Sequence, residues 1–176
     1  MHGRTLVGAL ALVTLIGSSV AAEPIRTPGR FGLGIGSGTL SNGLSAKYFM
    51  SKQDALQFHL GEFGGGGFEH RWRRFDDGIG LGVDYLFEMP DIARAGRAFD
   101  LAWNVGGGIG LGFDDDDRDD RDDWDFGLAV AFVLGLEFNF IPIPIDIVIE
   151  WRPGVLLVPD VDFDAIDFTA HLRVYF

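Results

Sequence analysis

Residues 114–125 form the densest group of potential metal ligands in the sequence. They comprise nine aspartates, two arginines and one tryptophan, so the segment has a charge of −7. Carboxylate oxygens are the ligands that Ca²⁺ and Mg²⁺ prefer, which makes Asp114, Asp116, Asp119 and Asp122 candidate ligands. The segment lacks the glycine at its sixth position and the glutamate at its twelfth that an EF-hand loop requires. A solvated, self-repelling loop is the stronger interpretation, so we predict no dedicated metal site and no cofactor.

A basic segment of opposite charge precedes this acidic one. Arg71, Arg73 and Arg74 surround Trp72. Guanidinium groups bind phosphates through paired hydrogen bonds, so this segment could hold the phosphates of lipopolysaccharide. The alternative is that the arginines pair with the acidic segment and fold one loop over the other. Both interpretations predict a surface that loses order in high salt.

Nucleophilic catalysis is the third chemistry to test. The serines after residue 22 lie at positions 37, 41, 45 and 51, and the histidines at 59, 70 and 171. No G-x-S-x-G turn is present, and no serine is adjacent to a histidine in the sequence. We therefore predict no catalytic residues and no enzymatic activity.

The elements that position these side chains alternate between apolar and small or polar residues. This period of two is typical of β-strands with two different faces. It recurs eight times, at 31–36, 44–51, 56–61, 79–88, 99–111, 126–140, 145–152 and 166–176. Ser41-Asn42-Gly43 predicts a turn between the first two strands. Inner turns are expected at 51–54, 89–98 and 139–144, the second of them long, and outer loops at 39–43, 62–77, 114–125 and 158–164. Together, these eight segments and their connections predict an antiparallel eight-stranded β-barrel.

The glycines indicate which face of the barrel is outside. A soluble, lipocalin-like barrel hides its apolar face, whereas a membrane barrel turns it toward lipid. Glycine recurs opposite the apolar positions, as at 32, 34, 36, 106, 108 and 110. Small residues are needed inside an eight-stranded barrel, whose lumen is just wide enough for side chains to fill. Lysine, which normally covers the surface of soluble β-proteins, occurs only at positions 47 and 52. A transmembrane barrel is favoured over a soluble periplasmic carrier.

The polar face of these strands then carries an inward ionisable set. Beside Glu88 and Asp100, we assign to a lumen ion network Lys47, Asp84, Glu137, Asp146, Glu150, Arg152, Asp167, His171 and Arg173. Buried charges need partners. Glu150 is expected to pair with Arg152 or Arg173, and Asp167 with His171 or Arg173. The network either fills and rigidifies the lumen or, through its excess of acid, lines a narrow cation-preferring conduit.

The N-terminus predicts export. Arg4, an apolar run from Leu6 to Ile16 and the small residues before Glu23 are typical of a secretory signal peptide cleaved after Ala22. We divide the chain into a signal peptide (1–22), an N-terminal periplasmic segment (23–30) and the barrel (31–176).

Composition narrows the class of partner. The 176 residues carry a net charge of −12, with 26 glycines and no cysteine. So acidic a chain is a poor nucleic-acid binder, because phosphate backbones require a basic surface. Without cysteine, neither disulfides nor thiolate metal sites can form.

The last residues resemble a known family. The ending His171-Leu172-Arg173-Val174-Tyr175-Phe176 is similar to the C-terminal assembly signal of bacterial outer-membrane β-barrels, with Leu172, Val174 and Phe176 as its apolar positions. The whole barrel region resembles the small eight-stranded barrels of the OmpA transmembrane-domain and OmpX type. Residues 43–49, 54–56 and 149–153 resemble uncharacterised secreted barrels of Gram-negative bacteria. The resemblance implies an outer-membrane location and recognition by the barrel assembly machinery, but no reaction.

The expected function is therefore that of a non-enzymatic, monomeric outer-membrane protein that contacts lipid and lipopolysaccharide through its outer loops. The alternatives are a narrow cation-preferring pore or small-solute conduit, and a soluble periplasmic carrier.

Overall fold

The computed structural model describes residues 24–63, 78–115 and 124–176, and this part of the chain is all β. Its strands are β1 (Phe31–Gly38), β2 (Ser41–Phe49), β3 (Asp54–Phe63), β4 (Ile79–Glu88), β5 (Ala93–Ala95), β6 (Phe99–Asp115), β7 (Trp124–Phe140), β8 (Ile145–Trp151), β9 (Gly154–Val158), β10 (Asp162–Asp164) and β11 (Phe168–Tyr175). No helix in the described residues is long and apolar enough to cross a membrane.

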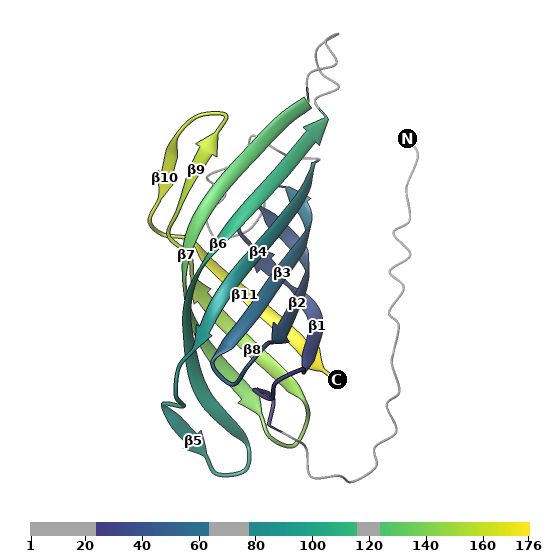
Figure 1. Ribbon diagram of the computed structural model, residues 1–176, viewed down its shortest axis with the longest axis vertical. Helices are drawn as coiled ribbons and strands as arrows, with labels where there is room; N and C mark the ends of the chain where they lie inside the picture. The colour runs from purple at the N-terminus through teal and green to yellow at the C-terminus, as the bar shows by residue number, and fades with distance from the viewer. Residues whose placement is uncertain (1–23, 64–77, 116–123) are drawn as a thin grey trace, which may run out of the picture.

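Eight of these strands close into an antiparallel barrel (Figure 1). They follow the order β1-β2-β3-β4-β6-β7-β8-β11, and β11 pairs with β1 to complete the ring. The period-two pattern explains the two faces. In β4, odd-numbered residues from Ile79 to Phe87 are exposed on the outside and even-numbered residues are buried. The predicted eight-stranded antiparallel barrel is confirmed.

The two ends of the barrel are built differently. We call the end that carries residues 24–30 and the chain's last residue the N-terminal mouth, and the other the loop end. Longer connections predominate at the loop end, where the hairpin of β9 and β10 projects beside the ring in Figure 1.

The predicted turn at Ser41-Asn42-Gly43 was wrong. Gly38 pairs with Ser41, so the turn consists of Thr39 and Leu40, and residues 41–43 already belong to β2. Both turn residues are buried. A Cβ atom added to Gly110 would lie only 2.4 Å from the carbonyl oxygen of Thr39. A Cβ atom added to Gly80 would lie only 2.1 Å from the carbonyl oxygen of Leu40. The turn therefore folds into the lumen against glycines of β4 and β6.

Three short strands occupy segments that we expected to be irregular. The turn expected at 89–98 contains β5, which pairs with the start of β6. The loop expected at 158–164 contains β10, which pairs with β9. The chain leaves β8 at Arg152 and Pro153, and proline has no amide to continue a ladder. β9 then rejoins β7 further along, where Val130 pairs with Val155.

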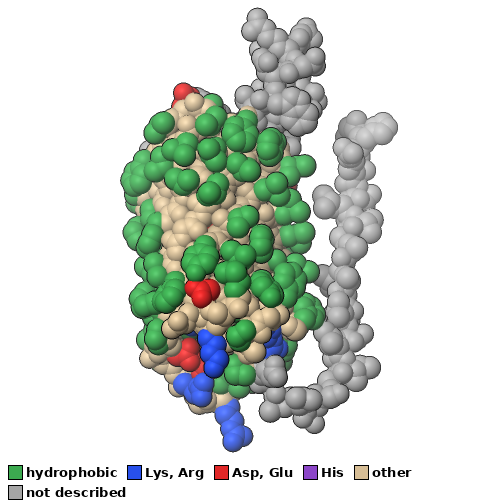
Figure 2. Space-filling model, viewed as in Figure 1, with side chains coloured by type: hydrophobic (Ala, Val, Ile, Leu, Met, Phe, Trp, Pro, Cys, Tyr) green, Lys and Arg blue, Asp and Glu red, His purple; other side chains and the backbone are tan. Residues whose placement is uncertain are grey.

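Large apolar side chains cover the outer wall (Figure 2). Exposed fractions of 40–60% are common there, as for Leu33 at 45%, Leu60 at 44% and Ile149 at 46%. In the same view, the lysines and arginines gather at the N-terminal mouth. The wall is thus apolar on the outside and polar within.

Candidate functional site

The lumen holds a network of buried charges between two apolar clusters. One cluster lies toward the N-terminal mouth and contains Ile25, Phe49, Ala55, Leu86, Val133 and Tyr175. The other lies toward the loop end and contains Leu40, Phe63, Ala129 and Leu156. Phe63 covers two glycines, since its ring would lie 1.7 Å from a Cβ on Gly112 and 2.4 Å from one on Gly127. Glycine at these positions makes room for the aromatic ring inside the barrel.

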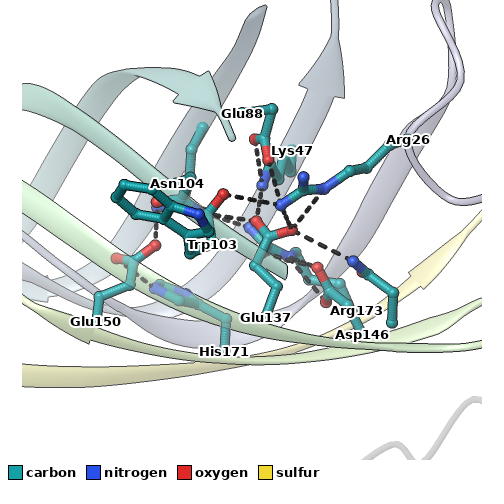
Figure 3. Close-up of polar contacts among 12 residues, drawn as sticks. Arg26, Lys47, Glu88, Trp103, Asn104, Glu137, Asp146, Glu150, His171 and Arg173 are labelled. Carbon is teal, nitrogen blue, oxygen red and sulfur yellow. Dashed lines mark hydrogen bonds and ion pairs between the residues drawn. The ribbon is translucent and has the colours of Figure 1, made fainter. Parts of the chain in front are cut away.

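The first group of charges lies at the N-terminal mouth (Figure 3). Lys47 of β2 forms ion pairs with Glu137 of β7 and, at 2.7 Å, with Glu88 of β4. Arg26, from the segment before β1, bridges the same two carboxylates at 2.7 Å (Glu137) and 2.9 Å (Glu88). Asn104 Nδ2 donates to Glu137 Oε1 at 2.6 Å. Two cations and an amide therefore hold two carboxylates whose side chains are fully buried.

A second group joins β3, β8 and β11. Arg173 pairs with Asp146 at 2.9 Å and donates to Gln57 Oε1 at 2.5 Å. The hydroxyl of Tyr175 donates to Asp146 Oδ2 at 2.7 Å. On its other side, Gln57 Nε2 donates to Asp84 Oδ2 at 3.0 Å. Gln57 thereby links this group to the next one.

The third group lies nearer the loop end. Arg152 pairs with Glu150 at 2.5 Å and with Asp84 at 2.7 Å, and it donates to Thr39 Oγ1 at 2.9 Å. His59 Nε2 lies 2.7 Å from Asp84 Oδ2. The inward-folded β1–β2 turn is therefore tied to the charged network through Thr39.

The same region contains a serine, a histidine and a carboxylate in a chain. Ser45 Oγ lies 3.1 Å from His171 Nδ1, and His171 Nε2 lies 3.0 Å from Glu150 Oε2. Such a chain can activate a hydroxyl for nucleophilic attack. Here Ser45 is fully buried and His171 is 2% exposed. In this conformation the hydroxyl has no surface that a substrate carbonyl could reach.

The charges of the described lumen nearly balance. The buried carboxylates are Asp84, Glu88, Glu137, Asp146 and Glu150, and the permanent cations are Arg26, Lys47, Arg152 and Arg173. His59 and His171 each contact one of the carboxylates. The sequence had predicted a clear excess of acid inside. Five carboxylates still outnumber four permanent cations, but the excess is smaller than predicted, because Arg26 supplies a cation that was not expected there and Asp100 binds Arg94 at the mouth.

Most predicted lumen residues lie where they were expected. Lys47, Asp84, Glu88, Glu137, Asp146, Glu150, Arg152, His171 and Arg173 are all buried in the barrel. Glu150 does pair with Arg152. The expected pairing of Asp167 was wrong, because His171 pairs with Glu150 and Arg173 with Asp146. Asp167 is half-buried just before β11.

Asp100 has the inward orientation expected of it, in step with Ala102 and Asn104, but it lies at the mouth and outside the buried network. There its carboxylate binds Arg94 of β5 through two hydrogen bonds of 2.5 and 2.9 Å. Tyr175 is 2% exposed and points into the barrel.

The remaining predicted site residues fall into two sets. Leu172, Val174 and Phe176 face outward from the last strand and its end, with Leu172 45% and Phe176 61% exposed. Outside the described residues are Arg71, Trp72, Arg73, Arg74, Asp116, Asp119 and Asp122. Asp114 belongs to β6, but its side chain is not among those described.

Sequence reasoning missed several members of the network. Gln57, His59 and Asn104 occupy inward positions of alternating segments, so the period of two could have identified them. Arg26 precedes the first alternating segment, and no periodic signal marks it. A comparison of the chain with protein-family models, with curated proteins and with solved structures found no match.

Proposed function

We propose that this protein is a non-enzymatic β-barrel that spans the bacterial outer membrane with a closed interior and interacts with its surroundings through the loop end. The observation that carries this proposal is the reversed polarity of the wall. Large apolar side chains such as Leu33, Phe58 and Ile149 are exposed, while lysine, arginine and carboxylate side chains are buried. Exposing this much apolar surface to water would be unfavourable, and lipid is the solvent that suits it.

Strand lengths support the same proposal. β2, β3 and β4 contain 9, 10 and 10 residues. A tilted transmembrane strand needs about 9–11 residues to cross the apolar layer. The even strand count places the first and the last residue of the barrel region at the same end, the N-terminal mouth. This agrees with a periplasmic location for both residues.

The filled lumen argues against a conduit. Phe63 and Leu40 pack across the barrel toward the loop end, and the turn at Thr39 closes against Gly110. Between the clusters, the charges bind one another at 2.5–2.9 Å instead of lining a path. We therefore expect no steady conductance in planar bilayers, and repeated cation-selective steps would refute a closed barrel.

Location is tested by cell fractionation combined with electrophoresis of unboiled samples. An outer-membrane barrel should be recovered with the outer membrane and should migrate differently before and after boiling. Extraction without detergent would contradict the proposal and favour a soluble carrier. Absence of enzymatic activity is tested separately, by comparing the acylation pattern of lipid A with and without the gene. We expect an unchanged pattern.

A further inference from the structure

The guanidinium of Arg26 lies in a cradle of oxygen atoms at the N-terminal mouth (Figure 3). It contacts the carboxylates of Glu137 at 2.7 Å and Glu88 at 2.9 Å. It also donates to two backbone carbonyls, those of Met89 at 2.5 Å and Trp103 at 3.1 Å. These oxygens come from β4, β6, β7 and the residue after β4. Four acceptors from three separate segments therefore converge on one planar cation.

The cradle offers more acceptor atoms than Arg26 uses. Asn104 Oδ1 and Asn139 Oδ1 are buried and have no hydrogen-bond partner among the described residues. Asn104 is fully buried and Asn139 is 7% exposed. A buried acceptor without a donor is unfavourable unless a water or a bound cation supplies the missing partner. The surplus indicates a site that can accept more donors than one arginine supplies.

The segment that carries Arg26 borders open space. A cavity of about 570 Å³ lies against it and is lined by Pro24, Arg26 and Pro28 together with Lys52, Asp91 and Asn139. Asp91, whose side chain is 47% exposed, lies 4.0 Å from Arg26 on the outer side. A carboxylate in this position can receive the guanidinium as it leaves the cradle.

The backbone allows this segment to move as a unit. Residues 24–28 form no strand, and Gly29 adopts a φ of +85°, which glycine reaches without strain. The amide of Gly29 is fixed to the carbonyl of Phe49 at 2.7 Å. Inside the barrel, the segment is held by Arg26 and by the buried side chain of Ile25. Across Gly29, the amide and the guanidinium of Arg30 donate to the carbonyls of Thr27 at 3.1 Å and Pro24 at 3.2 Å, so the segment pivots at Gly29 only when these two bonds break as well.

We propose that the oxygen cradle at the N-terminal mouth is a binding site for guanidinium-type cations. In this structure its occupant is the chain's own Arg26, and undocking of residues 24–28 opens the cradle to organic cations from solution. The proposal depends on the barrel interior and not on the membrane location. The filled loop end makes the site a closed vestibule and not a passage.

The absence of cysteine allows a clean test by single-cysteine labelling. Asn104→Cys places a thiol in the cradle, and Ala129→Cys places one in the cluster toward the loop end. Both are prepared with Arg26 intact, with Arg26→Ala and with Arg26→Gln, and are labelled with a cationic and an anionic methanethiosulfonate reagent. Barrel folding is checked on unboiled gels, so that loss of the fold is recognised separately.

We expect the cationic reagent to label Asn104→Cys roughly tenfold or more faster once Arg26 is replaced, because the vacated carboxylates concentrate cations. Replacement of Arg26 should increase the labelling rate of the anionic reagent less. Millimolar ethylguanidinium should suppress the labelling, whereas tetramethylammonium at the same concentration should not, since it cannot donate hydrogen bonds. Arg26→Lys should label at an intermediate rate. Ala129→Cys should stay unlabelled throughout.

Three results would overturn the proposal. Labelling at Asn104→Cys could be unaffected by loss of Arg26, or insensitive to ethylguanidinium. Ala129→Cys could gain reactivity in parallel, which would indicate general loosening. Finally, if neither Arg26→Ala nor Arg26→Gln folded, Arg26 would be an obligatory part of the fold and not an exchangeable occupant.

Discussion

The backbone amide of Phe176 donates a hydrogen bond to the carbonyl of Phe31 at 2.9 Å. The last residue of the chain is thereby paired with the first residue of β1. Five further residue pairs, from Gly32 with Tyr175 to Gly36 with His171, extend this seam between β1 and β11. Closure of the ring therefore depends on the pairing of β11 with β1.

Deletion of Phe176 should lower the yield of folded barrel. The change removes the terminal hydrogen bond of the seam and a side chain that is 61% exposed on the outer surface. Phe176→Ala keeps the backbone bond and serves as the matched control, so it should be less damaging. The measurement is the fraction of heat-modifiable, membrane-recovered protein. Equal insertion of the deletion variant and the full chain would contradict a role in assembly.

Gly112→Ala should destabilise the barrel by about 1–3 kcal/mol, because overpacking forces neighbouring groups to move. The new methyl group would lie 1.7 Å from the Phe63 ring. Gly107→Ala is the control on the same strand, since its nearest atom is Ala131 O at 3.4 Å. Urea unfolding in detergent gives both values. Combining Gly112→Ala with Phe63→Leu should give less than the sum of the single effects. Strict additivity would show that the two residues do not meet.

Arg173→Met should cost about 3–5 kcal/mol, because it leaves the carboxylate of Asp146 buried without its cation. The pair lies at 2.9 Å and both side chains are almost fully buried. Arg173→Met together with Asp146→Asn should be more stable than Arg173→Met alone, since no buried charge is then left uncompensated. Equilibrium unfolding of the four proteins forms a double-mutant cycle. A double variant less stable than Arg173→Met would contradict this explanation.

Stability should depend on pH through Asp167. Burial raises the pKa of the Asp167 carboxyl from 3.8 to about 6. The folded state therefore binds the proton more tightly than the unfolded chain, and this contribution to stability is complete below pH 3.8 and lost as the pH rises to about 6. Asp167→Asn should remove that part of the pH dependence. Unfolding measured between pH 4 and 7 tests this, and identical profiles for both proteins would refute it.

The sequence predicted the part of the fold that a period of two can encode. Leu33 and Leu172 face outward and Lys47 and Glu137 inward, because side chains alternate along every strand. Glycine opposite these apolar positions indicated a crowded lumen, and Gly112 beneath Phe63 shows how tight it is. Alternation therefore fixed both the architecture and most of the buried ion network.

Features that depend on register could not be predicted. Ser45 and His171 lie on strands that flank β1, and they meet only because both pair with it in one particular alignment. The turn was misplaced because Asn42-Gly43 is a strong local turn signal, whereas Leu40 adopts a φ of 59° that leucine disfavours. Arg26 acts through tertiary contacts alone, so no local sequence pattern predicts its role.

The β9–β10 hairpin has a consequence for how the barrel opens. β10 pairs with β9 and not with β11, and the exposed side chains of Val161 and Phe163 contribute little to the core. The backbone hydrogen bonds between β10 and β9 can break in local fluctuations, whereas those of the closed ring break only in global unfolding. Amide hydrogen exchange should therefore divide the molecule into two cooperative units. The amides of β10 should exchange early, and the amides of β2, β3 and β4 should exchange last and together.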